Sequence, residues 1–392
     1  MIARAFPLFV LIILLPDIYL YRRWVKPHAQ GRRRISLIWW MLTAVMLVAT
    51  CLLAKARDFT PHPQTPLNIY LFVLGVFTIP KLLLMFADWA GRALRRFSHG
   101  KRNWGIPVGI ALGALSAYVT IYGSTLGFNK FEVHRVDFAS ADLPEGFEGY
   151  RIALWSDAHV GNYLGKDAYL LRDAVDSINA MHPDAIFFLG DLQNVGPEEI
   201  EACLPTLSLL SAPDGVYSIL GNHDYSKYQR GTREERLANE ARTQDLQRRM
   251  GWRLLMNEHT LLYHGGDSIT LAGMEGNEQK GQDHGFAIWE KTVEGIDDGM
   301  FTIMLAHNPL HWDKYIVPNT NVQLTLSGHT HGGQLRLLGL STTSITFRED
   351  DGMYEREGKH LFVTRGLGAL IPLRFNVTGE VVLLTLHKQS KK

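Results

Sequence analysis

The stretch Gly328-His329-Thr330-His331-Gly332-Gly333-Gln334 places two histidines around one threonine, with glycine on both sides. The preceding run 322–327 alternates apolar and polar residues, which predicts a strand that ends in a tight turn. Residues i and i+2 of extended backbone point the same way, so we expect both imidazoles to face one spot. Two convergent imidazoles beside glycine backbone suit a transition metal, whereas the alternative is a pair of surface histidines in a turn.

Four more apolar strands are expected upstream, and each ends beside polar residues and a Gly or Pro. The strands span residues 152–155, 184–189, 215–220 and 301–305, within a pattern of alternating strands and helices. The residues that follow them are Asp157 and His159, then Asp191, then Asn222, His223 and Asp224, and finally His307. In open α/β sheets the loops at the carboxyl ends of strands converge. The five strand ends are therefore expected to deliver their side chains to one place.

This set of side chains combines neutral imidazoles, carboxylates and one amide. Such mixed nitrogen and oxygen donors suit Mn, Fe, Zn or Co, and they are too many for one tetrahedral ion. Two ions that share a bridging carboxylate would use them, and paired ions clamp the attacking and leaving oxygens of a phosphoryl displacement. The structural alternative is a set of capping aspartates, a structural asparagine and surface histidines.

Taken in order, these motifs resemble the calcineurin-like metallophosphoesterase superfamily. The resemblance rests on Asp157-x-His159, Gly190-Asp191, Gly221-Asn222-His223-Asp224, His307 and Gly328-His329-x-His331, and it covers residues 150–388. Within the superfamily the chain looks like the membrane-anchored branch of YkuE- and YaeI-type phosphoesterases and transmembrane metallophosphoesterase-domain proteins. One departure is Gln193-Asn194, where an acid is common in the family.

The resemblance implies an α/β fold, a four-layer α/β/β/α sandwich of two mixed sheets flanked by helices. It also implies two divalent ions (Mn, Fe or Zn), the first held by Asp157, His159, Asp191 and His331, the second by Asp191, Asn222, His307 and His329. His223 would act in catalysis, with Asp224 orienting its ring. Arg365 or Arg374 could contact phosphate, and a structural salt bridge is the alternative for both.

The first third of the chain carries four long apolar stretches, roughly 5–21, 37–54, 69–90 and 106–122. Each approaches the ~20 residues that cross a bilayer as a helix. For the first stretch a cleaved signal peptide is the alternative. Lys81 lies inside the third stretch, and we expect it to reach the interface or to pair with Asp17 rather than to mark a functional site.

These patterns divide the chain into a transmembrane domain (1–125), a linker and domain entry (126–149) and a metallophosphoesterase domain (150–388). The loops after the first and third stretches are rich in Arg and Lys, which places them in the cytoplasm and the catalytic domain on the extracytoplasmic side of a bacterial inner or plasma membrane. The net charge of +1 and the lack of a basic, aromatic stripe argue against a nucleic-acid partner.

The function expected from sequence is hydrolysis of a phosphomonoester, phosphodiester or pyrophosphate by metal-activated water, with a lipid-linked substrate beside the membrane. Two alternatives stay open. One is a cytoplasm-facing hydrolase of a UDP-diacylglucosamine-type pyrophosphate, an activity that some members of this branch have. The other, from a different class, is a non-catalytic membrane receptor or scaffold that keeps the fold.

Overall fold

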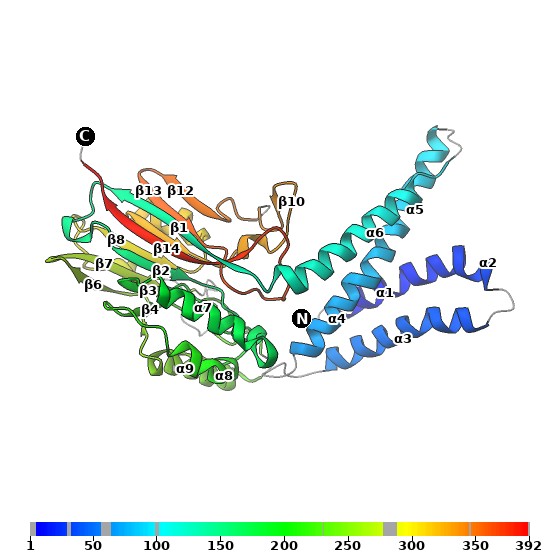
Figure 1. Ribbon diagram of the computed structural model, residues 1–392, viewed down its shortest axis with the longest axis horizontal. Coiled ribbons are helices and arrows are strands. Elements are labelled where there is room, and N and C mark those ends of the chain that lie inside the picture. Colours follow the sequence, from blue (N-terminus) through cyan, green and yellow to red (C-terminus); the bar gives the residue numbers. More distant parts are fainter. Residues whose placement is uncertain are drawn as a thin grey trace. The chain divides into compact units, whose positions relative to one another are not determined.

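The structure, a computed structural model, describes residues 5–29, 33–55, 64–98, 102–229, 231–276, 288–344 and 346–390. The chain forms two compact units, Met1–Thr125 and Leu126–Lys392 (Figure 1). The sequence suggests that the glycine-rich loop with His284 could edge the site and that a further strand lies near Ile345; both positions lie outside the described residues.

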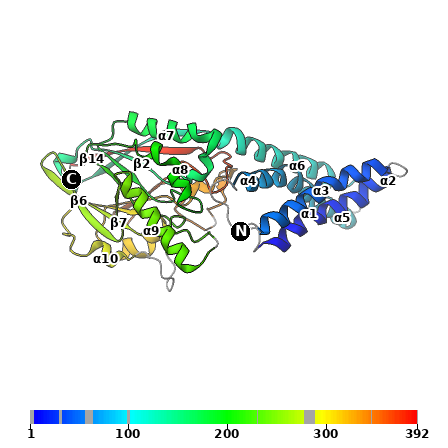
Figure 2. The ribbon, with the colours of Figure 1, turned by 90° about the horizontal axis from the view of Figure 1, so that it is seen from below.

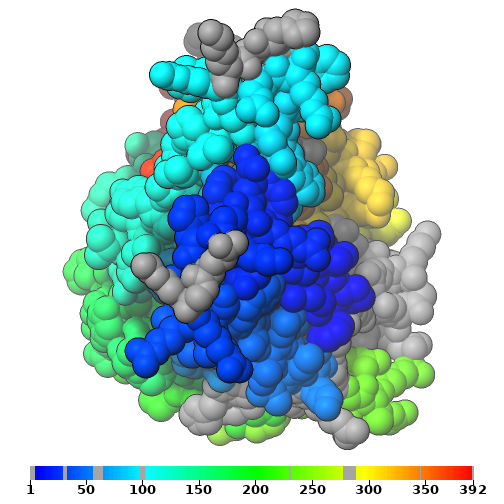
Figure 3. Space-filling model, turned by 90° about the vertical axis from the view of Figure 1, so that its right-hand side faces the viewer, coloured from blue at the N-terminus to red at the C-terminus, as the bar shows by residue number. Residues whose placement is uncertain are grey.

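The first unit consists of apolar helices, whose atoms are coloured blue to cyan in Figure 3. They are α1 (Phe6–Leu20), continued by Tyr21–Val25 and α2 (Lys26–His28), α3 (Arg33–Lys55), α4 (Gln64–Val73), continued by Leu74–Thr78 into α5 (Ile79–Ser98), and α6 (Gly105–Tyr122), continued by Gly123–Gly127. Three spans within the described residues are long and apolar enough to cross a membrane: Arg33–Lys55, Thr65–Phe97 and Gly105–Gly127. The first predicted stretch also forms a helix, but it contains Asp17 and runs directly into Arg22 and Arg23.

Two carboxylates are buried among these helices, and both are paired. Lys81 Nζ lies 2.7 Å from Asp17 Oδ1, which confirms the pairing expected for Lys81. Arg23 Nε lies 2.8 Å from the fully buried Asp88. Because a lone charge is costly in an apolar environment, each pair fixes how its helices pack.

The second unit contains two six-stranded sheets and a two-stranded hairpin. The first sheet has the order β1 (Phe131–Ser140), β14 (Gly379–Lys388), β2 (Arg151–Trp155), β3 (Ala185–Phe188), β4 (Val216–Ser218), β5 (Arg253–Leu254). The second has the order β12 (Gly352–Arg356), β13 (Lys359–Val363), β9 (Leu324–Ser327), β8 (Thr302–Ala306), β7 (Asp267–Met274), β6 (Glu258–His264). The hairpin pairs β10 (Arg336–Leu337) with β11 (Leu340–Ser341).

Three hydrophobic cores hold four layers together. Ala153 and Trp155 of β2 face α7 (Ala168–Ala180), α8 (Glu198–Leu207) and α9 (Arg233–Arg249), whereas Ile152 and Leu154 face the other sheet. A third core joins the second sheet to α10 (Trp289–Val293) and α11 (Val317–Asn319). α7 and α10 lie on opposite sides of the unit (Figure 2). Successive side chains of a strand point to opposite faces, so a strand that is apolar at every position packs against one layer on each side. The predicted sandwich is confirmed.

Residues 126–149 are not only a linker, because they contain β1, a ten-residue edge strand parallel to β14. Val136 and Phe138 turn toward the core between the sheets, while most other positions of β1 are exposed. His134 and Arg135 interrupt the apolar alternation, so the sequence pattern of this strand is weak.

The strands that carry the motifs run parallel within each sheet. β2, β3 and β4 are parallel neighbours in the first sheet, and β8, β9 and β13 in the second. Their carboxyl ends therefore meet at one edge of each sheet, and the motif loops leave from these edges.

Candidate metal centre

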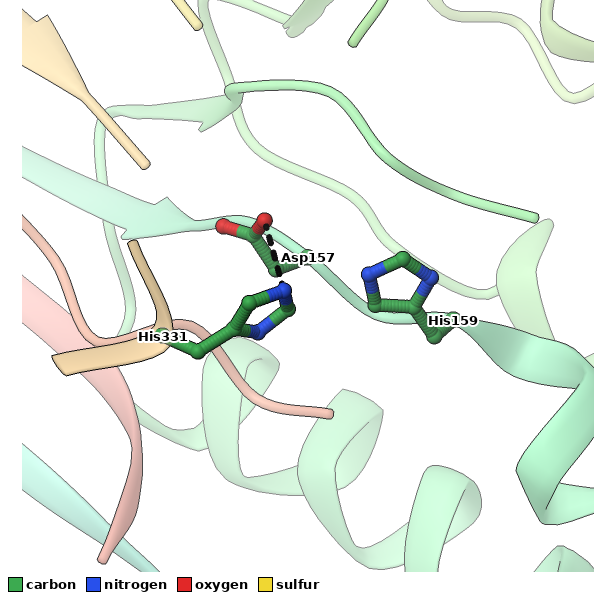
Figure 4. Close-up of side chains that lie close together, drawn as sticks. All are labelled: Asp157, His159 and His331. Carbon is green, nitrogen blue, oxygen red and sulfur yellow. Dashed lines mark ion pairs between the residues drawn. The ribbon is translucent and has the colours of Figure 1, made fainter. Parts of the chain in front are cut away.

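Four loops bring candidate ligands together in two adjoining groups. Asp157, His159 and His331 form one group (Figure 4), and Asp191, His307 and His329 form the other, with the ligand atoms of each group within 4.8 Å of one another. A third grouping joins His159, Asp191 and His223. Asp191 lies between the groups, because its Oδ2 is 3.2 Å from His307 Nε2 and 3.9 Å from His159 Nε2.

The two histidines of the opening motif serve different groups. We expected extended backbone to aim both rings at one spot, and this is wrong: β9 ends at Ser327, and His329 and His331 have φ of 72° and 53°. His331 Nε2 lies 3.6 Å from Asp157 Oδ1, whereas His329 Nδ1 lies 3.2 Å from His307 Nε2. A left-handed turn at each histidine separates the two rings.

Left-handed backbone is a feature of the whole centre. Asp157, His159, Asp191, His329 and His331 all have positive φ. Each such non-glycine residue costs roughly 1–2 kcal/mol, and strain of this kind concentrates at functional sites. Neighbouring glycines leave room for the carboxylates: a Cβ on Gly221 would lie 2.2 Å from Asp191 Oδ1, and one on Gly328 would lie 2.4 Å from Asp157 Oδ2.

The electrostatic environment keeps most of these imidazoles neutral. Burial lowers the pKa of His329 and of His331 to about 3. Burial also lowers the pKa of His159, well below its usual value. For His307 burial lowers the pKa, but Asp191 outweighs it and raises the pKa to about 9. Neutral imidazole is the form that binds metal, so three rings are ready to do so and His307 must first lose a proton.

Hydrogen bonds and buried unpaired atoms test whether these residues fit a cation. His307 Nδ1 lies 2.7 Å from the Leu189 carbonyl oxygen, which leaves Nε2 facing Asp191. Among the described residues, neither ring nitrogen of His159 nor Oδ1 of Asn222 has a hydrogen-bond partner, although these atoms are buried. Buried polar atoms without partners are costly, and coordination would satisfy the Asn222 oxygen and one ring nitrogen of His159. The donor set fits a divalent-metal centre.

His223 lies beside this centre in an oriented position. Its Nδ1 is 2.7 Å from the Asn194 carbonyl oxygen, and its ring centroid is 4.8 Å from that of His159 and 4.3 Å from that of Tyr228. We predicted that Asp224 orients the His223 ring, and this is wrong. The Asp224 carboxylate accepts four backbone N–H groups, from Asp191, Leu192, Gln193 and Gly221, and so it fixes two motif loops instead.

Sequence reasoning missed the residues that hold His223 in place. Glu199 is buried and accepts the backbone N–H of Asn194 at 2.5 Å and of Val195 at 3.0 Å, which fixes the loop that presents the Asn194 carbonyl. Tyr228 covers the His223 ring and accepts a hydrogen bond from Asn222 Nδ2 at 3.2 Å. The only sequence feature that marks Glu199 is the cluster of acidic residues in the first turn of α8. Acidic residues are common at helix N-termini, so this cluster does not identify Glu199 as a positioning residue.

The two arginines proposed as phosphate contacts have internal partners. Arg374 is 1% exposed, and its guanidinium donates to the carbonyl oxygens of Arg365, Gly366, Gly368 and His331. Arg365 pairs with Glu380, Glu132 and Asp351. The structural salt bridge given as the alternative is present for Arg365, whereas backbone carbonyl oxygens occupy the Arg374 guanidinium.

Glu380 anchors the loop that lies behind Asp157. It accepts hydrogen bonds from the Thr364 hydroxyl at 2.8 Å and from Arg365 Nε at 3.0 Å. Burial raises the pKa of Glu380, but its contacts with His134 and Arg365 outweigh burial and hold the pKa at about 2. The same loop donates from Gly368 to the Asp157 carbonyl oxygen at 2.9 Å.

Comparison with known proteins gives a consistent result. A family described as "Probable Calcineurin-like phosphoesterase, transmembrane domain" matches residues 3–128, and "Calcineurin-like phosphoesterase" matches residues 150–333. The chain is 32% identical to the uncharacterised metallophosphoesterase YkuE of Bacillus subtilis, over 70% of this chain and 94% of that protein. It is 27% identical to a transmembrane protein with metallophosphoesterase domain from Danio rerio, over 96% and 87%.

A solved dimetal phosphatase from Danio rerio matches 56% of this chain and 88% of its own, at 14% identity and a TM-score of 0.35.

Proposed function

Because the chain belongs to the calcineurin-like phosphoesterase family and carries that family's transmembrane domain, we propose that it is an integral membrane hydrolase that uses two divalent ions to cleave a lipid-linked phosphoester or pyrophosphate. The observation that carries this proposal is the pair of adjoining ligand groups with Asp191 between them. One ion would sit among Asp157, His159, His331 and Asp191, and the other among Asp191, Asn222, His307 and His329.

Bound ions would acidify a water molecule and neutralise charge on the phosphate. Around them, the role of the protein is to fix donors and to handle a proton. The Asn194 carbonyl holds Nδ1–H of His223, so Nε2 is the nitrogen that would give a proton to the leaving oxygen. Glu199 is a positioning residue in this scheme, because it holds the Asn194 loop and touches no reacting group.

The roles of Asp191 and His223 separate in one experiment on the full-length protein in detergent. Asp191→Ala should lose both bound metal and hydrolysis of p-nitrophenyl phosphate. His223→Ala should keep its metal and lose hydrolysis by ~10²–10⁴-fold, the usual contribution of a general acid. His264→Ala, a half-exposed histidine on β6, is the matched control and should change neither quantity.

Metal loss from His223→Ala would show that this residue is a ligand. A metal-loaded wild type that cleaves no phosphoester, across soluble and lipid-linked substrates, would refute the hydrolase and favour the scaffold.

Two finer parts of the proposal rest on the membrane unit. Anchoring raises the effective concentration of a substrate in the same bilayer, which favours a lipid-linked phosphate. Faster hydrolysis of a lipid-linked phosphoester than of its soluble headgroup, in vesicles containing the protein, is the expected result; equal rates would refute this part.

The basic first and third loops favour an extracytoplasmic catalytic domain. A reporter fused after Lys392 that works only in the cytoplasm would reverse the orientation and favour the nucleotide-linked alternative.

A further inference from the structure

The β10–β11 hairpin presents leucines to solvent. We call residues 336–341 the leucine hairpin, since Leu337, Leu338 and Leu340 are 39%, 103% and 72% exposed. Leu338 contributes no packing within its own unit. Single exposed leucines are ordinary, but three around one two-residue turn form an apolar projection. Moving this projection out of water would lower its free energy.

Two other hairpins of the same domain show that the turn geometry does not require leucine. In all three hairpins a two-residue turn joins the strands, and both of its residues have positive φ: Leu338-Gly339, Gly265-Gly266 and Glu357-Gly358. Such turns favour Gly, Asn and Asp. The other two turns have glycine or glutamate at their first position. The leucine hairpin instead has Leu338 there, at φ 52°, and its side chain is not packed against the domain. The fold itself therefore gives no reason for Leu338.

The leucine hairpin is fixed to the loop that carries His331. Thr342, the residue after the hairpin, donates its hydroxyl to the Gly333 carbonyl oxygen. In addition, the Arg336 N–H of the hairpin donates to the carbonyl oxygen of Phe375, in a second loop, at 3.0 Å. A Cβ on Gly333 would lie 2.9 Å from the Ser341 Cβ, so the backbones are in close contact. Whatever the leucines contact is thus held near one side of the metal centre.

The occupant that these observations favour is a lipid bilayer. The last apolar helical segment ends at Gly127 and β1 begins at Phe131, so three residues join the catalytic domain to a membrane-spanning helix. Four extended steps of chain reach on the order of 15 Å, which keeps the domain near the membrane in any orientation. Apolar side chains at the tip of a rigid element partition into the boundary between headgroups and acyl chains.

We propose that the leucine hairpin inserts into the bilayer surface and places the His331 side of the metal centre beside the lipid headgroups. This proposal depends on membrane anchoring and does not depend on hydrolysis. A result that refutes it would therefore leave the proposed phosphoesterase activity unaffected. It would give the centre a preference for phosphates that lie at the headgroup level.

The test uses the full-length protein in nanodiscs, with an environment-sensitive NBD fluorophore at single cysteines. The background replaces the exposed Cys51 by serine; Cys203 stays, since burial raises the pKa of its thiol to about 12 and leaves it unreactive. Leu338→Cys is the test site. Glu357→Cys is the matched control, because it occupies the same position of the same kind of turn.

The expected result is a blue-shifted NBD emission at position 338, quenched at least twofold by nitroxide-labelled lipids, and neither effect at position 357. Equal, unquenched emission at both positions would overturn the proposal. A blue shift at position 338 without quenching by labelled lipids would also overturn it, because the hairpin would then be packed against protein.

Discussion

Replacing Gly366 by alanine should weaken metal binding without replacing any candidate ligand. Gly366 has φ +67°, and a Cβ on it would lie 2.7 Å from the Asp157 Cβ and 3.0 Å from Asp157 Oδ2. Ordinary van der Waals contact begins at 3.4 Å, so the two groups must separate by about 0.7 Å. The loop cannot retreat freely, because Leu367 and Gly368 donate to the carbonyl oxygens of Ser156 and Asp157 at 3.0 and 2.9 Å.

Metal–ligand distances tolerate about ±0.2 Å. A ligand displacement of about 0.7 Å exceeds this tolerance and should lower metal affinity roughly 10–100-fold, or by about 1.4–2.8 kcal/mol. The control is Gly149→Ala, which has φ +76° and nothing within 4 Å of its Cβ. It carries the same left-handed backbone cost without the clash. The assay is metal content and p-nitrophenyl phosphate hydrolysis at graded free Mn²⁺. Identical metal saturation of the two variants would refute the argument that Gly366 makes room for Asp157.

Three further predictions concern charge. Glu380 has a pKa of about 2, below its unfolded value, so its contribution to stability is present above pH ~4.5 and is lost as the pH falls toward 2. The metal-free wild type should lose about 3 kcal/mol over that range in urea titrations, and Glu380→Gln should be less sensitive to pH. Lys81→Met leaves Asp17 buried and unpaired, so it should cost ~3–5 kcal/mol in detergent; Asp17→Asn in the same chain should recover most of this, and no recovery would argue against the pair. Because the pKa of His307 is raised to about 9, apparent metal affinity in competition titrations should fall up to about tenfold per pH unit from 8.5 to 6.5, whereas a flat profile would show that no proton is displaced.

The sequence alone determined which residues approach one another, and its buried strands together with the family resemblance indicated the layered fold. A run such as Ile152–Trp155 that is apolar at every position must be buried on both faces, which requires a sheet between two other layers. Polar residues placed just after neighbouring parallel strands of one sheet must lie close together, since those strands end at a common edge. Neither inference depends on loop conformation, and for that reason both are accessible from pattern and spacing.

Tertiary structure decided what local patterns do not encode. His329 and His331 separate because each adopts left-handed backbone, and Asp224 turns from His223 to four backbone N–H groups of two motif loops. β1 became a strand because β14, more than two hundred residues away, offers it a partner. The three leucines of the β10–β11 hairpin look like core residues in the sequence, and only the folded chain shows that their own domain leaves them uncovered. For Asp224 and β1 the deciding partner is distant in sequence, so no local propensity could report it.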